Sequence, residues 1–280
     1  MNQNEKEVKE RPKYIPFLVV LLFGIFLGLG VAVGAMLLIK GDVVSHDKKS
    51  QSGTTTKTES DIKKNQIVEL NEKDVSNYDA IIEYFNNHYG NKYPLETSNF
   101  SNKDILWTSF SMGTMKKVFA YRDSFSKDTM KEMAQYVYGA DVSYTDEDIP
   151  CPAGDGVLYR FSNNQYSFAN DVLHGHGGTG AFRSKFYFVK GSRDDGNNTM
   201  EIQVKVLYGD YCGDTCGPMM NFYKEANLNS SNSLYSTNGE YDSEDFDTAY
   251  QKFKDQLPTT TFTFEKDSVG GYGLKKITVE

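Results

Sequence analysis

The sequence contains little cysteine and no surplus of basic charge. Three cysteines in 280 residues exclude a small domain held together by a dense set of disulfides. The net charge of −8 argues against a nucleic-acid-binding protein, because such proteins neutralise phosphates with lysine and arginine. Aromatic residues make up 14% of the chain, which is ample for a packed core and excludes disorder over the whole chain.

One long apolar run, Phe17–Ile39, lies near the N-terminus and carries no charge. A helix of this length, at about 1.5 Å per residue, spans about 34 Å, against about 30 Å for the hydrocarbon core of a bilayer. The run therefore predicts a membrane-spanning helix. The alternative is a cleaved signal peptide, with the small residues Val33–Ala35 at the cleavage site. No cysteine lies near the run, which excludes a lipoprotein anchor.

Four glycines of this run form two pairs in which the members are four positions apart, Gly24 with Gly28 and Gly30 with Gly34. Small residues at this spacing let two membrane helices approach closely, so these glycines are candidates for a homodimer contact. Glycine is also common in membrane helices for other reasons. The spacing therefore leaves both a dimer and a monomer open.

The distribution of charge favours one orientation in the membrane. Basic residues lie closer to the run on its N-terminal side than on its C-terminal side, and basic flanks tend to stay in the cytoplasm. Residues 1–64 hold ten basic and seven acidic residues, so the acidic surplus lies in the rest of the chain. The sequence thus predicts a single-pass protein of the cell membrane, with the N-terminus in the cytoplasm and the C-terminal domain outside.

Composition divides the chain into four parts. The predicted parts are a basic head (1–16), the membrane helix (17–39), a flexible linker (40–66) and an extracytoplasmic domain (67–280). Most of the linker is rich in serine, threonine and lysine and lacks large apolar residues. Such a segment cannot bury enough apolar surface to offset the chain entropy lost on folding.

Helical periodicity begins after the linker. Apolar residues recur at helical spacing in three segments, which predict helices over 76–90, 101–113 and 126–139. Each segment begins with a serine that can cap the helix, and each ends at a glycine. The second segment also has Asp104 three residues after Ser101, which is the spacing of a capping box.

The hydrophobic period changes to two after Asp141, as is typical of strands. The predicted hairpins pair 157–160 with 165–169, 182–188 with 200–208, and 262–264 with 274–279; a loop is expected at 227–238 and a short helix at 245–253. Leu274 is out of phase with its strand, which predicts a bulge. Helices followed by antiparallel hairpins indicate an α+β fold. The complete prediction is an N-terminal transmembrane helix, then a soluble domain of two to three helices packed on an antiparallel sheet.

The glycine-rich stretch 173–180 contains the spacing of a dinucleotide-binding loop. That function needs a helix after the loop, because the pyrophosphate sits at a helix N-terminus, and here a strand-like pattern follows instead. His176–Gly178 is similar to the oxyanion loop of some lipases, but the chain has no matching nucleophile motif. Neither pattern supports an enzyme.

A zinc site is the more specific hypothesis for this stretch. His174 and His176 lie two residues apart, so an extended backbone would direct both side chains to one side. Together with Cys212 and Cys216 they would complete a tetrahedral set of ligands. The alternative is a glycine-rich loop between strands in which the histidines have no role.

The three cysteines also allow a disulfide, because an extracytoplasmic location favours oxidation. One pairing closes a short loop between Cys212 and Cys216, and the others join Cys151 to either of them. Each of these pairings leaves one of the three cysteines outside the disulfide. The third alternative leaves all three cysteines free or bound to metal.

The whole chain resembles single-pass cell-surface proteins of low-GC Gram-positive bacteria. The features that carry this resemblance are the basic head, Phe17–Ile39, the serine- and threonine-rich linker, Asp148–Cys151, His176–Gly178, and the C-terminal segments Phe262–Asp267 and Tyr272–Leu274. The C-terminal part is also similar to the last hairpin of cystatin-like and NTF2-like domains. The resemblance implies a location and a sheet with a helix packed on it, and it implies no activity.

We expect a membrane-anchored extracytoplasmic domain that binds or scaffolds an envelope protein or a cell-wall ligand, without catalysis and without a cofactor. The alternative is an envelope protein that binds zinc through His174, His176, Cys212 and Cys216, with hydrolysis as one use of the metal.

Overall fold

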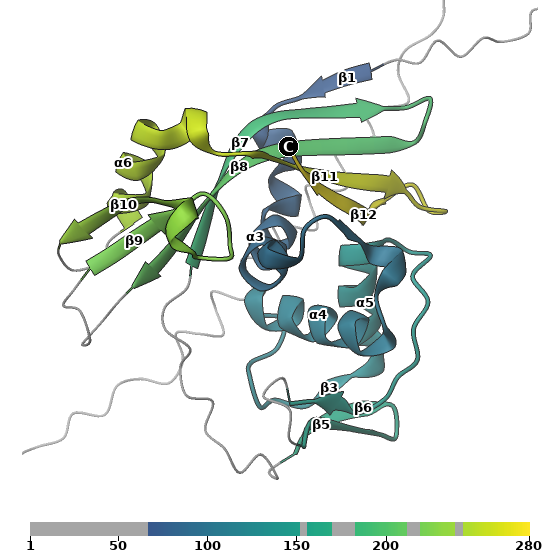
Figure 1. The fold of residues 1–280 in the computed structure, drawn as a ribbon. Helices are drawn as coiled ribbons and strands as arrows, with labels where there is room; N and C mark the ends of the chain where they lie inside the picture. The colour runs from purple at the N-terminus through teal and green to yellow at the C-terminus, as the bar shows by residue number, and fades with distance from the viewer. Residues whose placement is uncertain (1–66, 152–155, 170–182, 212–218, 239–242) are drawn as a thin grey trace, which may run out of the picture. The chain divides into compact units, whose positions relative to one another are not determined.

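The structure is a computed structural model that describes residues 67–151, 156–169, 183–211, 219–238 and 243–280, which lie within one unit, Asp61–Glu280 (Figure 1). The helices are α2 (Glu72–Val75), α3 (Asp79–Tyr89), α4 (Asn102–Met115), α5 (Lys127–Tyr138) and α6 (Ser243–Phe253), with short 3-10 turns η1 (Ser76–Tyr78), η2 (Gly90–Lys92), η3 (Thr97–Asn99), η5 (Ser230–Asn232) and η6 (Lys254–Gln256). The strands are β1 (Ile67–Leu70), β2 (Leu95–Glu96), β3 (Phe125–Ser126), β4 (Ile149–Pro150), β5 (Val157–Ser162), β6 (Gln165–Phe168), β7 (Arg183–Asp194), β8 (Thr199–Tyr211), β9 (Met219–Tyr223), β10 (Ser233–Asn238), β11 (Thr259–Lys266) and β12 (Tyr272–Val279).

Two of the three predicted N-terminal caps are confirmed. The Ser101 hydroxyl accepts from the Asp104 backbone N–H at 3.3 Å, and the Asp104 carboxylate accepts from the Ser101 N–H at 3.0 Å, so a capping box starts α4. The Ser126 hydroxyl accepts from the Thr129 N–H at 3.1 Å and starts α5. That helix ends at Gly139, whose φ of +86° favours glycine.

The prediction of Ser76 as an N-cap is wrong. Asn71 caps the short helix α2, and the Ser76 hydroxyl instead donates to the Lys73 carbonyl at 3.0 Å. The backbone then passes through η1 into α3 without a break. A serine in a helical conformation turns its hydroxyl toward the preceding turn, so it is not available to the next one.

Among the described residues, the large sheet is built on the long antiparallel hairpin of β7 and β8. The path runs β1-β7-β8-β11-β12-β2, and β9 and β10 branch from the far end of β8. The first half of β8 pairs with β11 and its last residues pair with β9. The predicted bulge is confirmed, since Phe264 pairs with Leu274 while Thr263 pairs with Lys276.

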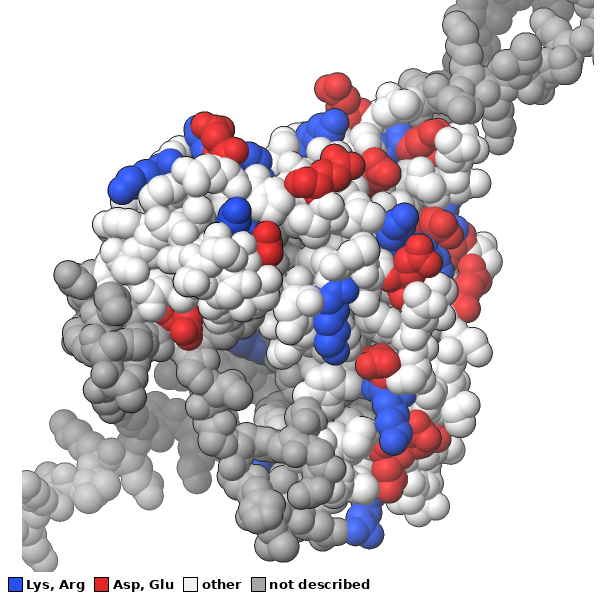
Figure 2. Space-filling model, viewed as in Figure 1, with Lys and Arg blue, Asp and Glu red and all other residues white. Residues whose placement is uncertain are grey.

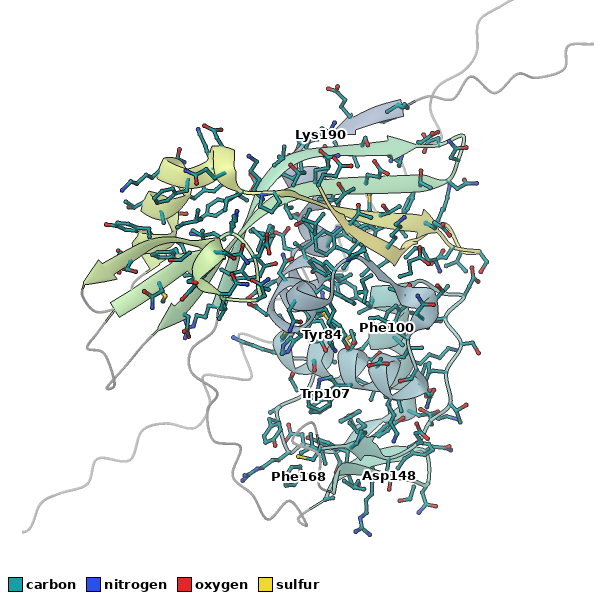
Figure 3. The ribbon with its side chains drawn as sticks, in the orientation of Figure 1. Tyr84, Phe100, Trp107, Asp148, Phe168 and Lys190 are labelled. Atoms are coloured by element: carbon teal, nitrogen blue, oxygen red, sulfur yellow. The ribbon has the colours of Figure 1, made fainter. Side chains whose placement is uncertain are left out.

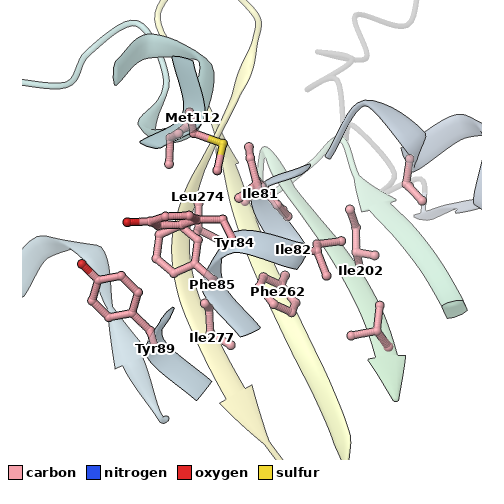
Figure 4. Packing of buried hydrophobic residues seen from close by; sticks show 14 of the residues in the cluster. Ile81, Ile82, Tyr84, Phe85, Tyr89, Met112, Ile202, Phe262, Leu274 and Ile277 are labelled. Carbon is pink, nitrogen blue, oxygen red and sulfur yellow. The ribbon is translucent and has the colours of Figure 1, made fainter. Parts of the chain in front are cut away.

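The main core lies between α3 and this sheet. Figure 4 shows Ile82 and Phe85 of α3 over Ile202, Phe262 and other residues of the neighbouring strands. These side chains are less than 2% exposed. Each buried side chain of this size contributes about 1.5–3 kcal/mol of transfer free energy, so this interface holds the helix in place.

The far end of β8 departs from the predicted two-faced hairpin. From Met200 to Val206 alternate residues are buried, as predicted, but Leu207–Gly209 are buried on both faces. Helix α6 covers the second face there, with Phe246 packed in the same cluster as Leu207 and Phe222. The predicted helix at 245–253 is thus confirmed.

The predicted loop at 227–238 is wrong over its second half. Residues 233–238 form β10, which pairs with β9. This strand is mostly polar, and its only large apolar side chains, Leu234 and Tyr235, are adjacent and half-buried, so it has no hydrophobic alternation that the sequence could reveal.

A second, four-stranded sheet in the order β3-β6-β5-β4 lies on the other side of α4 and α5 in the described residues (Figure 1). Its core joins Phe110 of α4 and Met130 of α5 to Phe125, Tyr159 and Tyr166. Asn163 and Asn164, both with positive φ, make the two-residue turn of its hairpin. This hairpin is confirmed, but as part of a sheet with its own core.

The fold as predicted from the sequence is therefore wrong. The described residues form an α+β arrangement with two antiparallel sheets, where one sheet was expected, because α4, α5 and the small strands bury a second, aromatic cluster. No helix of the described residues is long and apolar enough to cross a membrane. The longest, α4, has 14 residues and extends about 21 Å. The predicted span Phe17–Ile39, with its glycine pairs, lies outside the described residues.

Candidate functional site

Two adjacent hollows lie where α3 ends. The Tyr93 hollow, of about 200 Å³, is lined by Tyr93, Tyr208, Thr260, Glu225 and their neighbours. The Asn86 hollow, of about 290 Å³, is lined by Asn86, Asn87, His88 and Leu228. Gly90, Asn91 and Ala226 line both. The two spaces are therefore neighbours with a common wall, and we call them the paired hollows.

The first wall is the end of α3, which approaches the facing segment closely at Gly90. A Cβ atom on Gly90 would lie 2.7 Å from the Tyr208 hydroxyl and 3.0 Å from the Ala226 Cβ. The φ of Gly90 is −54°, so it is the space and not the backbone angle that requires glycine here. The predicted helix end at Gly90 is confirmed, and this contact explains why the residue there is glycine.

The second wall is the segment 224–228, which follows β9. The Glu225 carboxylate accepts from Asn227 Nδ2 at 3.2 Å and from Asn232 Nδ2 at 2.9 Å. The Lys224 N–H donates to the Asn232 carbonyl at 3.0 Å, and the Asn232 side chain is buried. One carboxylate thus fixes the segment that presents Ala226 and Leu228 to the hollows.

A half-satisfied amide belongs to the lining of the Asn86 hollow. Asn86 is fully buried, and its Oδ1 accepts from the Tyr93 hydroxyl at 3.0 Å. Its Nδ2 has no hydrogen-bond partner among the described residues. A buried donor without a partner costs about 1–3 kcal/mol. Whichever way the amide is turned, the Tyr93 hydroxyl can satisfy only one of its ends.

The phenols of the Tyr93 hollow stay protonated at neutral pH. Burial raises the pKa of Tyr93 well above its ordinary value, with a smaller contribution from Tyr208. Burial also raises the pKa of Tyr208, and the nearby Glu225 carboxylate raises it further. Both hydroxyls therefore act as neutral hydrogen-bonding groups.

His88 supplies a second neutral group at the edge of the Asn86 hollow. Its ring lies 4.5 Å from the ring of Tyr84, centroid to centroid. Tyr84 lies between α3 and α4 (Figure 3), where its hydroxyl is 3.4 Å from the Thr108 hydroxyl. Desolvation on this side lowers the pKa of His88 below 6.5, so the imidazole is neutral at pH 7 and can both donate and accept.

A third hollow, of about 280 Å³, is lined by Phe100, Tyr138 and Lys275 among others. The buried Tyr138 hydroxyl also has no hydrogen-bond partner among the described residues. It lies toward Thr108 in the core between the helices. This hollow therefore offers no comparable group to a ligand.

The predicted metal ligands His174, His176, Cys212 and Cys216 lie outside the described residues. In the ranges that are described, no group of three or more His, Cys, Asp or Glu residues could hold a metal ion. Cys151, the remaining disulfide candidate, is buried at the end of β4, where its N–H donates to the Gly156 carbonyl at 3.0 Å. The zinc site and the disulfide pairings remain predictions.

One feature of the sequence alone points to the Asn86 site. Asn86 follows Ile82 by four positions, so it lies on the apolar stripe of the helix, where a polar side chain needs an explanation. The facing residues of the hollow could not be found in this way, because Ala226 and Leu228 are far from Asn86 in the sequence.

Comparisons with protein families, with curated proteins and with solved structures gave no match to this chain. The similarity to cystatin-like or NTF2-like domains therefore stays a prediction, and the function must be argued from the site itself.

Proposed function

We propose that residues 67–280 form a binding domain of the cell envelope that holds a small, neutral, polar ligand in the paired hollows. The observation that carries the proposal is the buried Asn86 amide, which has one end bonded to Tyr93 and the other end without a partner among the described residues. A ligand that accepts from Nδ2 would remove the cost of leaving this donor unpaired.

The size and lining of the paired hollows support this proposal. Taken together they fall within the range of about 300–1,000 Å³ that small-molecule sites occupy. Polar side chains predominate in the Asn86 hollow, where Ala226 and Leu228 supply the apolar surface, and such a lining suits a polar ligand.

The charge of the site favours a neutral ligand. The groups nearest Asn86 are uncharged at pH 7, including His88, whose pKa lies below 6.5. Lys224 and Glu225, which line the Tyr93 hollow, carry opposite charges. On the face drawn in Figure 2, basic and acidic side chains are also interspersed, so this face has no broad field of one sign.

The envelope location rests on the sequence alone. The basic head, the apolar run and the polar linker precede the domain, and none of them belongs to the described residues. The partner that we propose is accordingly a cell-wall ligand. Protease digestion of intact cells, compared with lysed cells, checks this location, since an outside domain is cleaved in both.

Ligand-observed saturation-transfer NMR with the full chain tests the binding proposal. The probes are glucose, N-acetylglucosamine and N-acetylalaninamide as neutral molecules, glucosamine as a cation and glucuronate as an anion. We expect at least one neutral probe to receive saturation and the charged probes to receive less.

Two variants, each with one alanine replaced by leucine, make the test specific to the site. Ala226→Leu fills the common wall of the paired hollows and should remove the signal. Ala120→Leu makes the same change at an exposed position outside them and should keep it. Binding of only the charged probes, or an equal loss in both variants, would contradict the proposal.

A further inference from the structure

The Asn86 hollow combines a hydrogen-bond donor with an apolar wall. Oδ1 of Asn86 is occupied by Tyr93, so the group left for a ligand is the Nδ2 donor, which is fully buried and can be reached only when the lining residues move apart. Ala226 and Leu228 line the same hollow and offer only apolar side chains. The hollow therefore suits a group with an acceptor oxygen on one side and a small apolar part on the other.

The acetamido group has this composition. Its carbonyl oxygen is a strong acceptor that can receive Nδ2–H, and its methyl group can lie against Ala226 and Leu228. A plain hydroxyl would satisfy Nδ2 but leave the apolar wall without a partner. A carboxylate would bring a charge into a space whose nearest groups are neutral, which is costly.

The Tyr93 hollow extends the site beyond such a group. It shares Gly90, Asn91 and Ala226 with the Asn86 hollow, so a ligand that lies over these shared residues can extend into both. The rings of Tyr93 and Tyr208 give it apolar surface, while Thr260, Lys224 and Asn227 give it polar groups. A ring that carries several hydroxyls matches this mixture.

An extended peptide fits the same place less well. Peptides are usually bound along a strand edge or in a long groove, with contacts that repeat along the chain. The paired hollows are two adjacent spaces closed by the end of α3 on one side and by residues 224–228 on the other. They can hold one compact unit more readily than a running backbone.

We propose that the paired hollows bind an N-acetylated sugar, with the acetamido group on Asn86 in the Asn86 hollow and the sugar ring in the Tyr93 hollow. This inference rests on the proposed function and names the chemical class of its ligand. It assigns the Nδ2 of Asn86 to the acetyl carbonyl and the wall of Ala226 and Leu228 to the acetyl methyl.

The test compares N-acetylglucosamine with glucose, using the full chain. In saturation-transfer NMR the acetyl methyl should receive the strongest saturation of all ligand protons, because it packs against Ala226 and Leu228. By calorimetry, N-acetylglucosamine should bind about tenfold or more tightly than glucose, since glucose leaves Nδ2 or the apolar wall unmatched.

Two variants test the two contacts proposed for the acetamido group, one with the Asn86 Nδ2 and one with the apolar wall. Asn86→Asp keeps the shape of the side chain and the acceptor for Tyr93 but removes the Nδ2 donor. It should lower the affinity for N-acetylglucosamine about tenfold. Leu228→Asn removes the apolar wall, and asparagine suits the φ of +44° at this position, so this variant should fold even if Asn86→Asp does not. It should lower the preference for N-acetylglucosamine over glucose. Asn99→Asp, at an exposed asparagine outside the paired hollows, should leave both affinities unchanged.

Three results would overturn the inference while leaving the proposed function intact. They are equal binding of glucose and N-acetylglucosamine, saturation spread evenly over the sugar ring, and binding of N-acetylalaninamide as tight as that of the sugar, which would indicate a peptide ligand. A failure of all the neutral probes would overturn both proposals.

Discussion

The hydroxyl of Tyr93 donates to Oδ1 of Asn86 at 3.0 Å, while Nδ2 of the same buried amide has no partner among the described residues. Tyr93 follows α3 and η2, and Asn86 lies in the last turns of α3, so the bond folds the chain back on the helix end. An apolar residue in place of Asn86 would avoid the unpaired donor. It would also leave the Tyr93 hydroxyl without its acceptor, and the proposed ligand would account for the donor that remains unpaired.

The first prediction concerns the stability of this pair. Tyr93→Phe should lower the free energy of unfolding by about 1–3 kcal/mol, because both ends of a buried amide then lack a partner. Adding Asn86→Leu should recover part of this loss, since replacing both polar groups by apolar ones of similar shape can be nearly neutral. Urea denaturation of the four chains of this double-mutant cycle measures the coupling.

Tyr121→Phe is the control for this cycle. Tyr121 is 48% exposed, so the loss of its hydroxyl should change stability by less than about 0.5 kcal/mol. A double variant that is as unstable as the sum of its single changes would show that Tyr93 and Asn86 do not act as a pair.

The second prediction is a loss of stability in mild acid that depends on His88. Desolvation lowers the pKa of His88 below 6.5 in the folded state, so the unfolded chain takes up the proton more readily. The stability that the neutral His88 side chain contributes is present above pH 6.5 and is lost as the pH falls through the pKa of the folded state. Because His88 is exposed, the loss should be small; thermal melting between about pH 7.5 and pH 5 should show it, and His88→Gln should reduce it. An unchanged pH dependence in His88→Gln would assign the effect to other groups.

The third prediction concerns two aspartates that join α5 to the hairpin of β11 and β12. The Asp267 carboxylate accepts from the backbone N–H groups of Ala140 at 2.8 Å and Gly271 at 2.7 Å, and Asp141 accepts from the Ser268 N–H at 2.9 Å. The Ala140 N–H is the main cause that lowers the pKa of Asp267, with Gly271 and its neighbours adding to it. Each loop thus provides the acceptor for the other.

Asp267→Ala should cost about 1 kcal/mol, a modest figure because the carboxylate is close to solvent. Since the folded pKa lies below 3.8, the contribution of the charge is present above pH 3.8 and is lost as the pH falls through the folded pKa. Asp267→Asn keeps only one of the two acceptor oxygens, so it should lose this pH dependence together with the hydrogen bond from Ala140 or the one from Gly271. Denaturation at neutral and acid pH measures both effects, and equal acid sensitivity in the wild type and Asp267→Asn would contradict the assignment.

The fourth prediction concerns the cysteines and histidines outside the described residues. We expect the full chain, made in an oxidising compartment without chelator, to carry one disulfide and no metal. Its native mass should then be that of the reduced chain less two hydrogen atoms, and peptide mapping would name the pair. One bound zinc with all thiols reduced would contradict this and support a site at His174, His176, Cys212 and Cys216.

Local signals in the sequence predicted several elements well. The capping box of Ser101 and Asp104, the caps of α5 and the alternation of residues 200–206 each depend on neighbours in the chain, so they could be read directly. The bulge at Leu274 followed from a change of phase within a single strand. In these places the local preference and the final structure agree.

The rest depends on contacts between distant parts of the chain. β10 is a polar strand that pairs only because β9 offers it an edge, and Leu207–Gly209 are buried on both faces because α6 covers them. The candidate site has the same origin, since Asn86 of α3 and Ala226, which follows β9, line the same hollow. A single sequence gives the polar residue on the apolar stripe but not the residues that surround it.

The most direct test of the account is the side-chain amide signal of Asn86 in the full chain with isotope-labelled asparagine, assigned through its absence in Asn86→Leu. On addition of N-acetylglucosamine this signal should shift, because Nδ2 gains an acceptor, while the signal of the exposed Asn99 should stay where it is. Shifts at other asparagines with the Asn86 signal unmoved would contradict the account and place the ligand elsewhere.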